Sequence, residues 1–122
     1  KLARLAGVDS LHTGTVVGKM QGGEEEVVAI NNFLKSDWYG LKSVLPTASG
    51  GLHPGHVPDL VRILGKDVLC NFGGGIHGHP DGSEAGARSV VEAFEAVQNG
   101  VILKDYAQNH TALQRALEKW VH

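Results

Sequence analysis

Short apolar runs alternate with amphipathic segments along this chain of 122 residues. Three runs predict β-strands, at residues 8–13, 43–48 and 68–72. Each run precedes a segment with apolar residues at helical spacing, namely Val27, Ile30 and Leu34; Leu60, Val61 and Leu64; and Ala87, Val90, Val91, Phe94 and Val97. This alternation predicts an α/β domain with a parallel sheet. The nearly continuous apolar run 68–72 is typical of a parallel strand covered on both faces.

Residues that favour helix ends support the same division of the chain. Pro58 suits the first position of the second helix, and Asp81 with Glu84 forms a capping-box pair for the third. A final amphipathic helix is expected over residues 106–120. Residues 1–7 resemble the last turns of a helix that Gly7 ends. A chain that begins in this way, without Met, is expected to be part of a longer protein.

Composition narrows the function classes. Hydrophobic residues make up 42% of the chain, which is enough for a core, and eleven basic against thirteen acidic residues give a net charge of −2. Without a basic stripe, nucleic acid is not an expected partner. Cys70 is the single cysteine, so an internal disulfide is excluded. No apolar run approaches the ~20 residues that cross a membrane, and a cytoplasmic protein is expected.

Glycine-rich segments follow all three predicted strands, at residues 14–23, 49–51 and 73–75. Ligands of parallel α/β folds bind at the carboxyl ends of the strands. Glycine lets the backbone approach a ligand, and its N–H groups can bind phosphate. The sequence therefore predicts a phosphate site formed by the second and third segments, although tight turns alone are an alternative. In the first segment, Lys19 is expected on a movable lid, and His12 precedes it as a donor to phosphate.

Two other sites remain open at this level. Gly73, Gly75 and Gly78 match the dinucleotide pattern G-x-G-x-x-G, so a small Rossmann-like nucleotide binder is an alternative, although the acidic residue of that pattern is missing. The histidine pairs of the two later loops can be read as metal ligands or as partners of the loop backbone: His53 and His56, and His77 and His79.

Three motifs resemble the large subunit of ribulose-bisphosphate carboxylase/oxygenase (RuBisCO). Residues 11–20, Leu-His-Thr-Gly-Thr-Val-Val-Gly-Lys-Met, resemble strand 6 and loop 6 of that family. Residues 45–53, Leu-Pro-Thr-Ala-Ser-Gly-Gly-Leu-His, resemble strand 7, and residues 72–80, Phe-Gly-Gly-Gly-Ile-His-Gly-His-Pro, resemble strand 8 and its phosphate loop. The motifs follow the family's order and span most of the chain. Residues 76–82 are similar to the archaeal type III or II/III forms.

The resemblance implies that residues 1–122 form strands 6–8, with their helices, of a TIM (β/α)8 barrel. It implies carboxylation or oxygenation (a monooxygenase reaction) of ribulose 1,5-bisphosphate with CO2 or O2. Lys19 would be catalytic and reach the new carboxylate, although Gln21 stands where the family usually has Glu. The positions that match the family's substrate-binding residues are His12 for one phosphate, Ser49 for a hydroxyl, Gly51, Gly73 and Gly74 for the other phosphate, and also Gly50, Asn71 and Phe72.

The resemblance also implies that another polypeptide must supply the remaining parts of the enzyme. The family binds Mg²⁺ through residues on earlier strands, so no metal ligand is expected in this chain. The partners implied are the N-terminal part of the large subunit and further copies in a homo-oligomer, and the chain alone is expected to be inactive. A non-catalytic half-barrel that binds phosphate is an alternative. A RuBisCO-like enolase or isomerase is another, which Lys19 disfavours.

Overall fold

The computed structural model describes residues 1–14, 17 and 24–121. They form two compact units: unit 1 contains Lys1–Gly50 and Ile63–Asn71, and unit 2 contains Gly51–Arg62 and Phe72–His122. Lys19 and most of the predicted lid, 14–23, lie outside the described residues. The elements in chain order are α1 (Leu2–Leu5), β1 (Ser10–His12), α2 (Glu24–Lys35), β2 (Leu45–Ser49), η1 (Pro54–His56), α3 (Val57–Leu64), β3 (Leu69–Asn71), α4 (Gly73–His77), α5 (Gly82–Gln98), α6 (Leu103–Ala107) and α7 (Thr111–Trp120).

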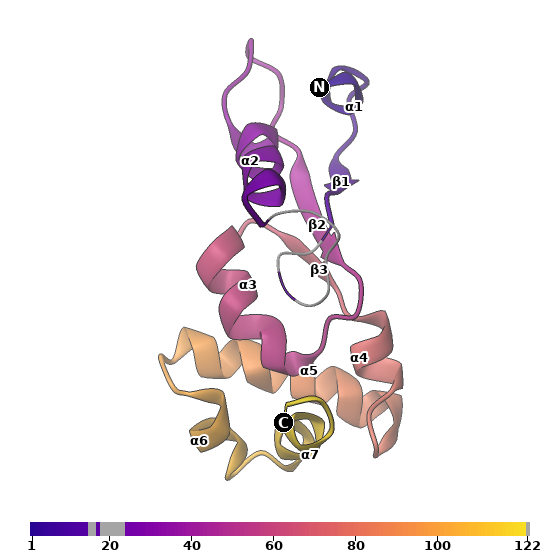
Figure 1. Ribbon diagram of the computed structural model, residues 1–122, viewed down its shortest axis with the longest axis vertical. Coiled ribbons are helices and arrows are strands. Elements are labelled where there is room, and N and C mark those ends of the chain that lie inside the picture. Colours follow the sequence, from indigo (N-terminus) through magenta and orange to yellow (C-terminus); the bar gives the residue numbers. More distant parts are fainter. Residues whose placement is uncertain (15–16, 18–23, 122) are drawn as a thin grey trace. The chain divides into compact units, whose positions relative to one another are not determined.

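Unit 1 is built on a parallel sheet, as the alternation of strands and helices predicts. Within the described residues the sheet has three strands in the order β1-β2-β3, so β2 is the central one (Figure 1). β1 and β2 pair through Leu11 and Pro46, and β2 and β3 pair through Ala48 and Cys70. Since each outer strand has one strand neighbour here, one edge of β1 and one of β3 are unpaired.

The buried side of α2 differs from the predicted apolar stripe at one position. Val27 and Leu34 are buried, but Ile30 is 38% exposed and Asn31 is buried instead. The Asn31 amide has no hydrogen-bond partner among the described residues. Hydrophobicity alone assigned Ile30 to the core, and that prediction is wrong.

Arg4 fastens α1 to the end of α2. Its side chain is only 3% exposed and donates to the carbonyl groups of four residues: Phe33 (2.7 Å), Ser36 (2.6 Å), Leu41 (3.2 Å) and Lys42 (3.1 Å). The last carbonyls of a helix lack intrahelical donors and carry negative partial charge, so a buried cation is suited to this place. The predicted helix end is confirmed, because α1 is followed by Gly7 with φ +80°.

Unit 2 is helical, and its core lies between α5 and α7. The buried face of α5 consists mostly of small side chains, which allows close helix packing: Gly86, Ser89, Val90, Glu92, Ala93 and Ala96. A Cβ on Gly86 would lie 2.1 Å from the carbonyl oxygen of Ile76 in α4, so glycine is required there. The predicted apolar side of this helix is wrong at two positions, since Ala87 is exposed and Val91 is 56% exposed.

Three local predictions in unit 2 are corrected by the structure. Gly73–Gly75 are not a loop but the first turn of α4. Asp81 makes no side-chain capping bond within the part of the chain that is described, because its carboxylate pairs with Arg115 of α7. The expected single helix over 106–120 is two helices, α6 and α7, with a break at residues 108–110. None of the described helices is both long and apolar enough to cross a membrane.

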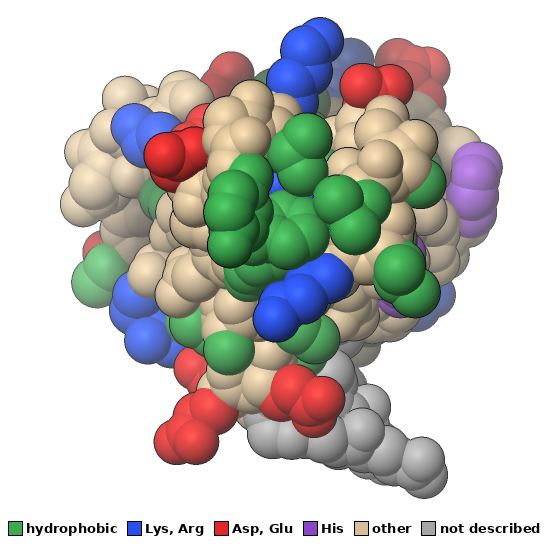
Figure 2. All heavy atoms as spheres, turned by 90° about the horizontal axis from the view of Figure 1, so that it is seen from above, with side chains coloured by type: hydrophobic (Ala, Val, Ile, Leu, Met, Phe, Trp, Pro, Cys, Tyr) green, Lys and Arg blue, Asp and Glu red, His purple; other side chains and the backbone are tan. Residues whose placement is uncertain are grey.

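Apolar side chains remain exposed on unit 1. Figure 2 shows hydrophobic side chains gathered beside lysine and arginine side chains on one face. The prediction that residues 68–72 are covered on both faces is wrong for the described residues, since Leu69 of β3 is 43% exposed. The exposed large hydrophobic residues of unit 1 are Leu2, Leu5, Val8, Ile30, Tyr39, Leu41, Leu45 and Leu69. Contiguous surfaces of this kind mark places where other polypeptide binds.

Candidate functional site

The carboxyl ends of the strands meet at one edge of the sheet in unit 1. Ser49 ends β2 and is the register partner of Asn71, which ends β3. His12 ends β1 opposite Thr47, and the next backbone N–H of that strand, from Thr13, donates to the Thr47 carbonyl at 3.2 Å. His12 and Asn71 are exposed and Ser49 is half-buried, so three of the predicted substrate-binding residues lie along this edge.

Within unit 2, the third glycine segment lies against the residues that follow Gly51. A Cβ on Gly75 would be 2.2 Å from the carbonyl oxygen of Leu52 and 2.9 Å from the Cα of His53. The first turn of α4 therefore packs directly on the backbone that follows Gly51. Gly51 itself has φ +65°, a conformation that favours glycine.

Gly73 and Gly74 differ from the other glycines of this region. Both are exposed and in the helical conformation of α4, and apart from their chain neighbours and the backbone of α4, no described atom lies within 4 Å of a Cβ built on either. Neither packing nor backbone conformation therefore requires glycine at these two positions. Helix geometry leaves their N–H groups without an acceptor inside α4. The first turn of α4 thus has backbone donors without an intrahelical acceptor at two exposed residues.

Phe72 anchors the start of this turn. Its side chain is buried and packs edge-on against Phe94 of α5, with the ring centroids 6.2 Å apart. Only the backbone of Phe72 is therefore available to a ligand.

Two hydrogen bonds join His53 and His56 within their own loop. The N–H of His56 donates to the His53 carbonyl (2.9 Å), and the N–H of His53 donates to Nδ1 of His56 (3.4 Å). Burial and the charge of His56 lower the pKa of His53 from 6.5 to about 4. Burial also lowers the pKa of His56, although Asp59 opposes the shift. Both imidazoles are neutral at pH 7, so neither brings positive charge to a phosphate.

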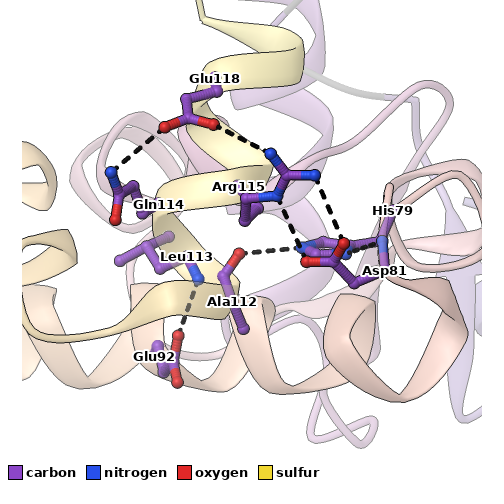
Figure 3. Close-up of polar contacts among 8 residues, drawn as sticks. All are labelled: His79, Asp81, Glu92, Ala112, Leu113, Gln114, Arg115 and Glu118. Carbon is purple, nitrogen blue, oxygen red and sulfur yellow. Dashed lines mark hydrogen bonds and ion pairs between the residues drawn. The ribbon is translucent and has the colours of Figure 1, made fainter.

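His79 joins the loop before α5 to the start of α7 (Figure 3). Its Nδ1 accepts from the N–H of Asp81 (3.0 Å), so Nε2 carries the proton and donates to the Ala112 carbonyl (2.9 Å). His77 lies 2.9 Å from the Ser83 hydroxyl. The interpretation of these histidines as partners of the loop backbone is confirmed for His56 and His79. Within the described ranges no group of three or more His, Cys, Asp or Glu side chains is placed to hold a metal ion.

Two further contacts fix α7, and the sequence interpretation missed both. Glu92 is buried on α5 and accepts from the N–H of Leu113 at 2.9 Å (Figure 3). The second contact is the pair of Arg115 with Asp81 (3.4 Å), and Arg115 also pairs with Glu118 of its own helix (3.7 Å). The sequence does carry a signal for the Glu92 contact. Glu92 lies at helical spacing from Ser89 and Ala96, and a carboxylate buried on that helix face needs a hydrogen-bond donor.

Comparison with known proteins places these motifs in a larger context. Residues 1–120 match the family model of the "Ribulose bisphosphate carboxylase large chain, catalytic domain". A ribulose bisphosphate carboxylase of Pyrococcus furiosus is 52% identical over 120 residues, which cover 98% of this chain and 29% of that protein. One of Methanocaldococcus jannaschii is 48% identical over 134 residues, which cover 98% of this chain and 32% of that protein. The chain therefore spans less than a third of the length of these relatives.

Solved structures show the same likeness. The octameric ribulose-1,5-bisphosphate carboxylase/oxygenase of Pyrococcus horikoshii has 48% identity and a TM-score of 0.92, over 97% of this chain and 28% of that chain. The dimeric archaeal Rubisco of Hyperthermus butylicus has 42% identity and a TM-score of 0.87, over 98% of this chain and 31% of that chain. A rubisco-like protein of Alicyclobacillus acidocaldarius has 41% identity and a TM-score of 0.89, over 98% of this chain and 30% of that chain.

Proposed function

Because the chain belongs to the family of ribulose bisphosphate carboxylase large chains, we propose that it is the part of such an enzyme that binds a phosphate group of ribulose 1,5-bisphosphate. The observation that carries this proposal is the pair Gly73 and Gly74. Both are exposed and helical, and no described atom beyond their chain neighbours and the backbone of α4 lies within 4 Å of the Cβ position of either. Glycine in a helix costs up to about 1 kcal/mol each relative to alanine, so a ligand that must contact the backbone explains them.

Phosphate binding at these glycines follows from simple electrostatics. The N–H groups of a helix's first turn carry positive partial charge and lack intrahelical acceptors, so an anion receives hydrogen bonds there. Gly51 supports the same role, because the backbone after it packs against Gly75 of that turn. A methyl group at Gly73 or Gly74 would occupy the space through which phosphate oxygens approach.

The remaining roles are assigned within the same proposal. We assign His12 to the other phosphate and Ser49 to a sugar hydroxyl, with Gly50 and Asn71 at the same strand ends. Phe72 contributes through its backbone, since its side chain is buried against Phe94. Lys19, which lies outside the described residues, is assigned to the carboxylate formed on addition of CO2.

Other polypeptide must complete this enzyme. The Mg²⁺ of the family does not fit the described residues, which hold no suitable cluster of ligands, so no step through a metal is assigned to this chain. We propose that the missing part of the large subunit supplies the metal site and the rest of a (β/α)8 barrel. The unpaired edges of β1 and β3 and the exposed apolar residues of unit 1 support that partner. Homo-oligomerisation is proposed as well, because relatives form an octamer and a dimer.

The carboxylase is favoured over the rubisco-like alternative. The Pyrococcus furiosus carboxylase is 52% identical to this chain, whereas two rubisco-like proteins of known structure are 41% and 36% identical. We therefore assign carboxylation, with its competing oxygenation, to the complete enzyme.

A chimeric enzyme, called the joined enzyme below, tests this proposal. Residues 1–120 replace the matching segment of the Pyrococcus furiosus carboxylase, and incorporation of labelled CO2 is measured with and without ribulose 1,5-bisphosphate. We expect incorporation that depends on the bisphosphate, while the 122-residue chain alone gives none. The intact Pyrococcus furiosus enzyme is the control for assay conditions. A joined enzyme that assembles like that control and fixes no CO2 would contradict the proposal.

A further inference from the structure

The end of α7 contacts residues that follow each of the two later glycine segments, and these contacts lie within unit 2. The Trp120 indole stacks on the His53 imidazole, with ring centroids 5.8 Å apart and planes 6° from parallel, and His53 is two residues after Gly51. On its other side, Cζ2 of Trp120 lies 3.3 Å from the position of a Cβ on Gly78, the residue after α4. Lys119 adds a hydrogen bond from Nζ to the Gly78 carbonyl. One helix end therefore touches the segment after Gly51 and the segment after Gly74.

The contact with His53 is tightly constrained. His53 and His56 hold each other through one backbone–backbone hydrogen bond and one from the His53 N–H to Nδ1 of His56, and their ring centroids lie 3.6 Å apart. A Cβ on Gly55 would be 2.5 Å from a methyl of Val121 and 3.1 Å from the His53 ring, so this turn has no spare room. Because His53 is neutral at pH 7, it can stack on Trp120 without a hydrated charge. The position of this loop is therefore defined by its contacts with the end of α7.

α7 is also anchored at its other end. His79 donates to the Ala112 carbonyl, and Glu92 accepts from the Leu113 N–H. These contacts hold the start of the helix to the loop after α4 and to α5. The helix is thus fixed at its first turn, and at its last turn it contacts His53 and Gly78, which follow the glycine segments.

We propose that Trp120 is a positioning residue for phosphate binding, which through His53 and Gly78 sets the spacing between the Gly51 segment and the first turn of α4. This inference rests on the function proposed above. Donors from two separate segments bind one phosphate well only when their spacing is held to within about 0.5 Å. Trp120 does not contact the phosphate in this arrangement, and its effect passes through the two loops.

The test uses the joined enzyme and three substitutions. Trp120→Ala is expected to raise the KM for ribulose 1,5-bisphosphate about tenfold and to change kcat less than about twofold, the pattern of lost substrate binding. Trp120→Phe keeps an aromatic ring for His53 and is expected to restore most of the affinity. Leu113→Ala is the matched control, because Leu113 is a fully buried residue of the same helix. It is expected to lower the melting temperature without raising KM.

A double substitution makes the assignment specific. His53→Gln is expected to raise KM, and combined with Trp120→Ala it is expected to add little further, because both changes break the same stack. If Trp120→Ala does not assemble, Trp120→Leu keeps the apolar bulk without the ring and is expected to raise KM as well. An unchanged KM in the assembled tryptophan variant, or an equal rise in Leu113→Ala, would overturn the positioning role. An inactive joined enzyme without substitutions would instead contradict the proposed function.

Discussion

Gly74→Ala is expected to stabilise the fold and to weaken phosphate binding. Gly74 is exposed in the first turn of α4, and within the described part of the chain nothing beyond its chain neighbours and the backbone of α4 lies within 4 Å of a Cβ built there. Alanine is favoured over glycine by about 1 kcal/mol in a helix interior, and we take about half of that for a first turn. In a chain of 122 residues, 1 kcal/mol shifts the melting temperature by about 4 °C. The expected rise is therefore about 2 °C.

Binding is expected to change in the opposite direction. The new methyl group covers backbone N–H groups that we assign to phosphate, and a hydrogen bond to a charged group contributes about 1.5–3 kcal/mol. Loss of one such bond corresponds to a rise in KM for ribulose 1,5-bisphosphate of about 10- to 100-fold. Thermal unfolding by circular dichroism and steady-state kinetics of the joined enzyme measure the two effects.

A matched glycine separates the two causes. Gly86→Ala puts a Cβ 2.1 Å from the Ile76 carbonyl oxygen, so it is expected to lower the melting temperature. An unchanged KM in Gly74→Ala would refute the assignment of phosphate to this turn. A lower melting temperature in Gly74→Ala would refute the argument that no packing requires glycine there.

Three further predictions concern the contacts that hold each unit. Glu92→Ala leaves the buried N–H of Leu113 without its acceptor and is expected to lower the free energy of unfolding, measured with urea, by about 1–3 kcal/mol. Glu92→Gln is expected to lower it less, and equal, negligible losses in the two variants would contradict this. Arg4→Met removes the donor of four carbonyls and is expected to speed amide hydrogen exchange over residues 36–42, whereas unchanged exchange would show that Arg4 does not hold this segment. The pKa of His53 falls from 6.5 to about 4 on folding, so its contribution to stability is complete above pH 6.5 and is lost as the pH falls towards 4. Thermal melts of His53→Gln between these pH values should lack this component, and a pH dependence identical to that of the unsubstituted chain would contradict the shift.

The parallel sheet could be predicted because its signals are local. Apolar runs separated by helical segments leave few topologies, and the structure pairs the three runs in chain order. The carboxyl ends of the strands, and with them Ser49 and Asn71, then fall at one edge. The glycine segments were recognisable for the same reason, since glycines grouped after a strand are visible without knowing their neighbours.

Features that depend on distant contacts could not be predicted. Three successive glycines disfavour a helix, yet Gly73–Gly75 form the first turn of α4, where Gly75 fits against the Leu52 backbone. Asp81 satisfies a capping pattern locally but pairs with an arginine 34 residues away. Close packing of α5 on α7 selects small residues and a buried Glu92, whereas a hydrophobicity pattern selects Val91. The stack of Trp120 on His53 joins segments that only the tertiary structure brings together.

The glycine amides themselves provide the most direct test of phosphate binding. The chain has 17 glycines, so a sample labelled with ¹⁵N-glycine gives a spectrum that can be assigned completely. Titration with inorganic phosphate is predicted to shift the amides of Gly51, Gly73 and Gly74 in a saturable manner and to leave that of Gly100, in a turn after α5, in place. Amides of the first three that do not move, or that move no more than Gly100 does, would contradict the account.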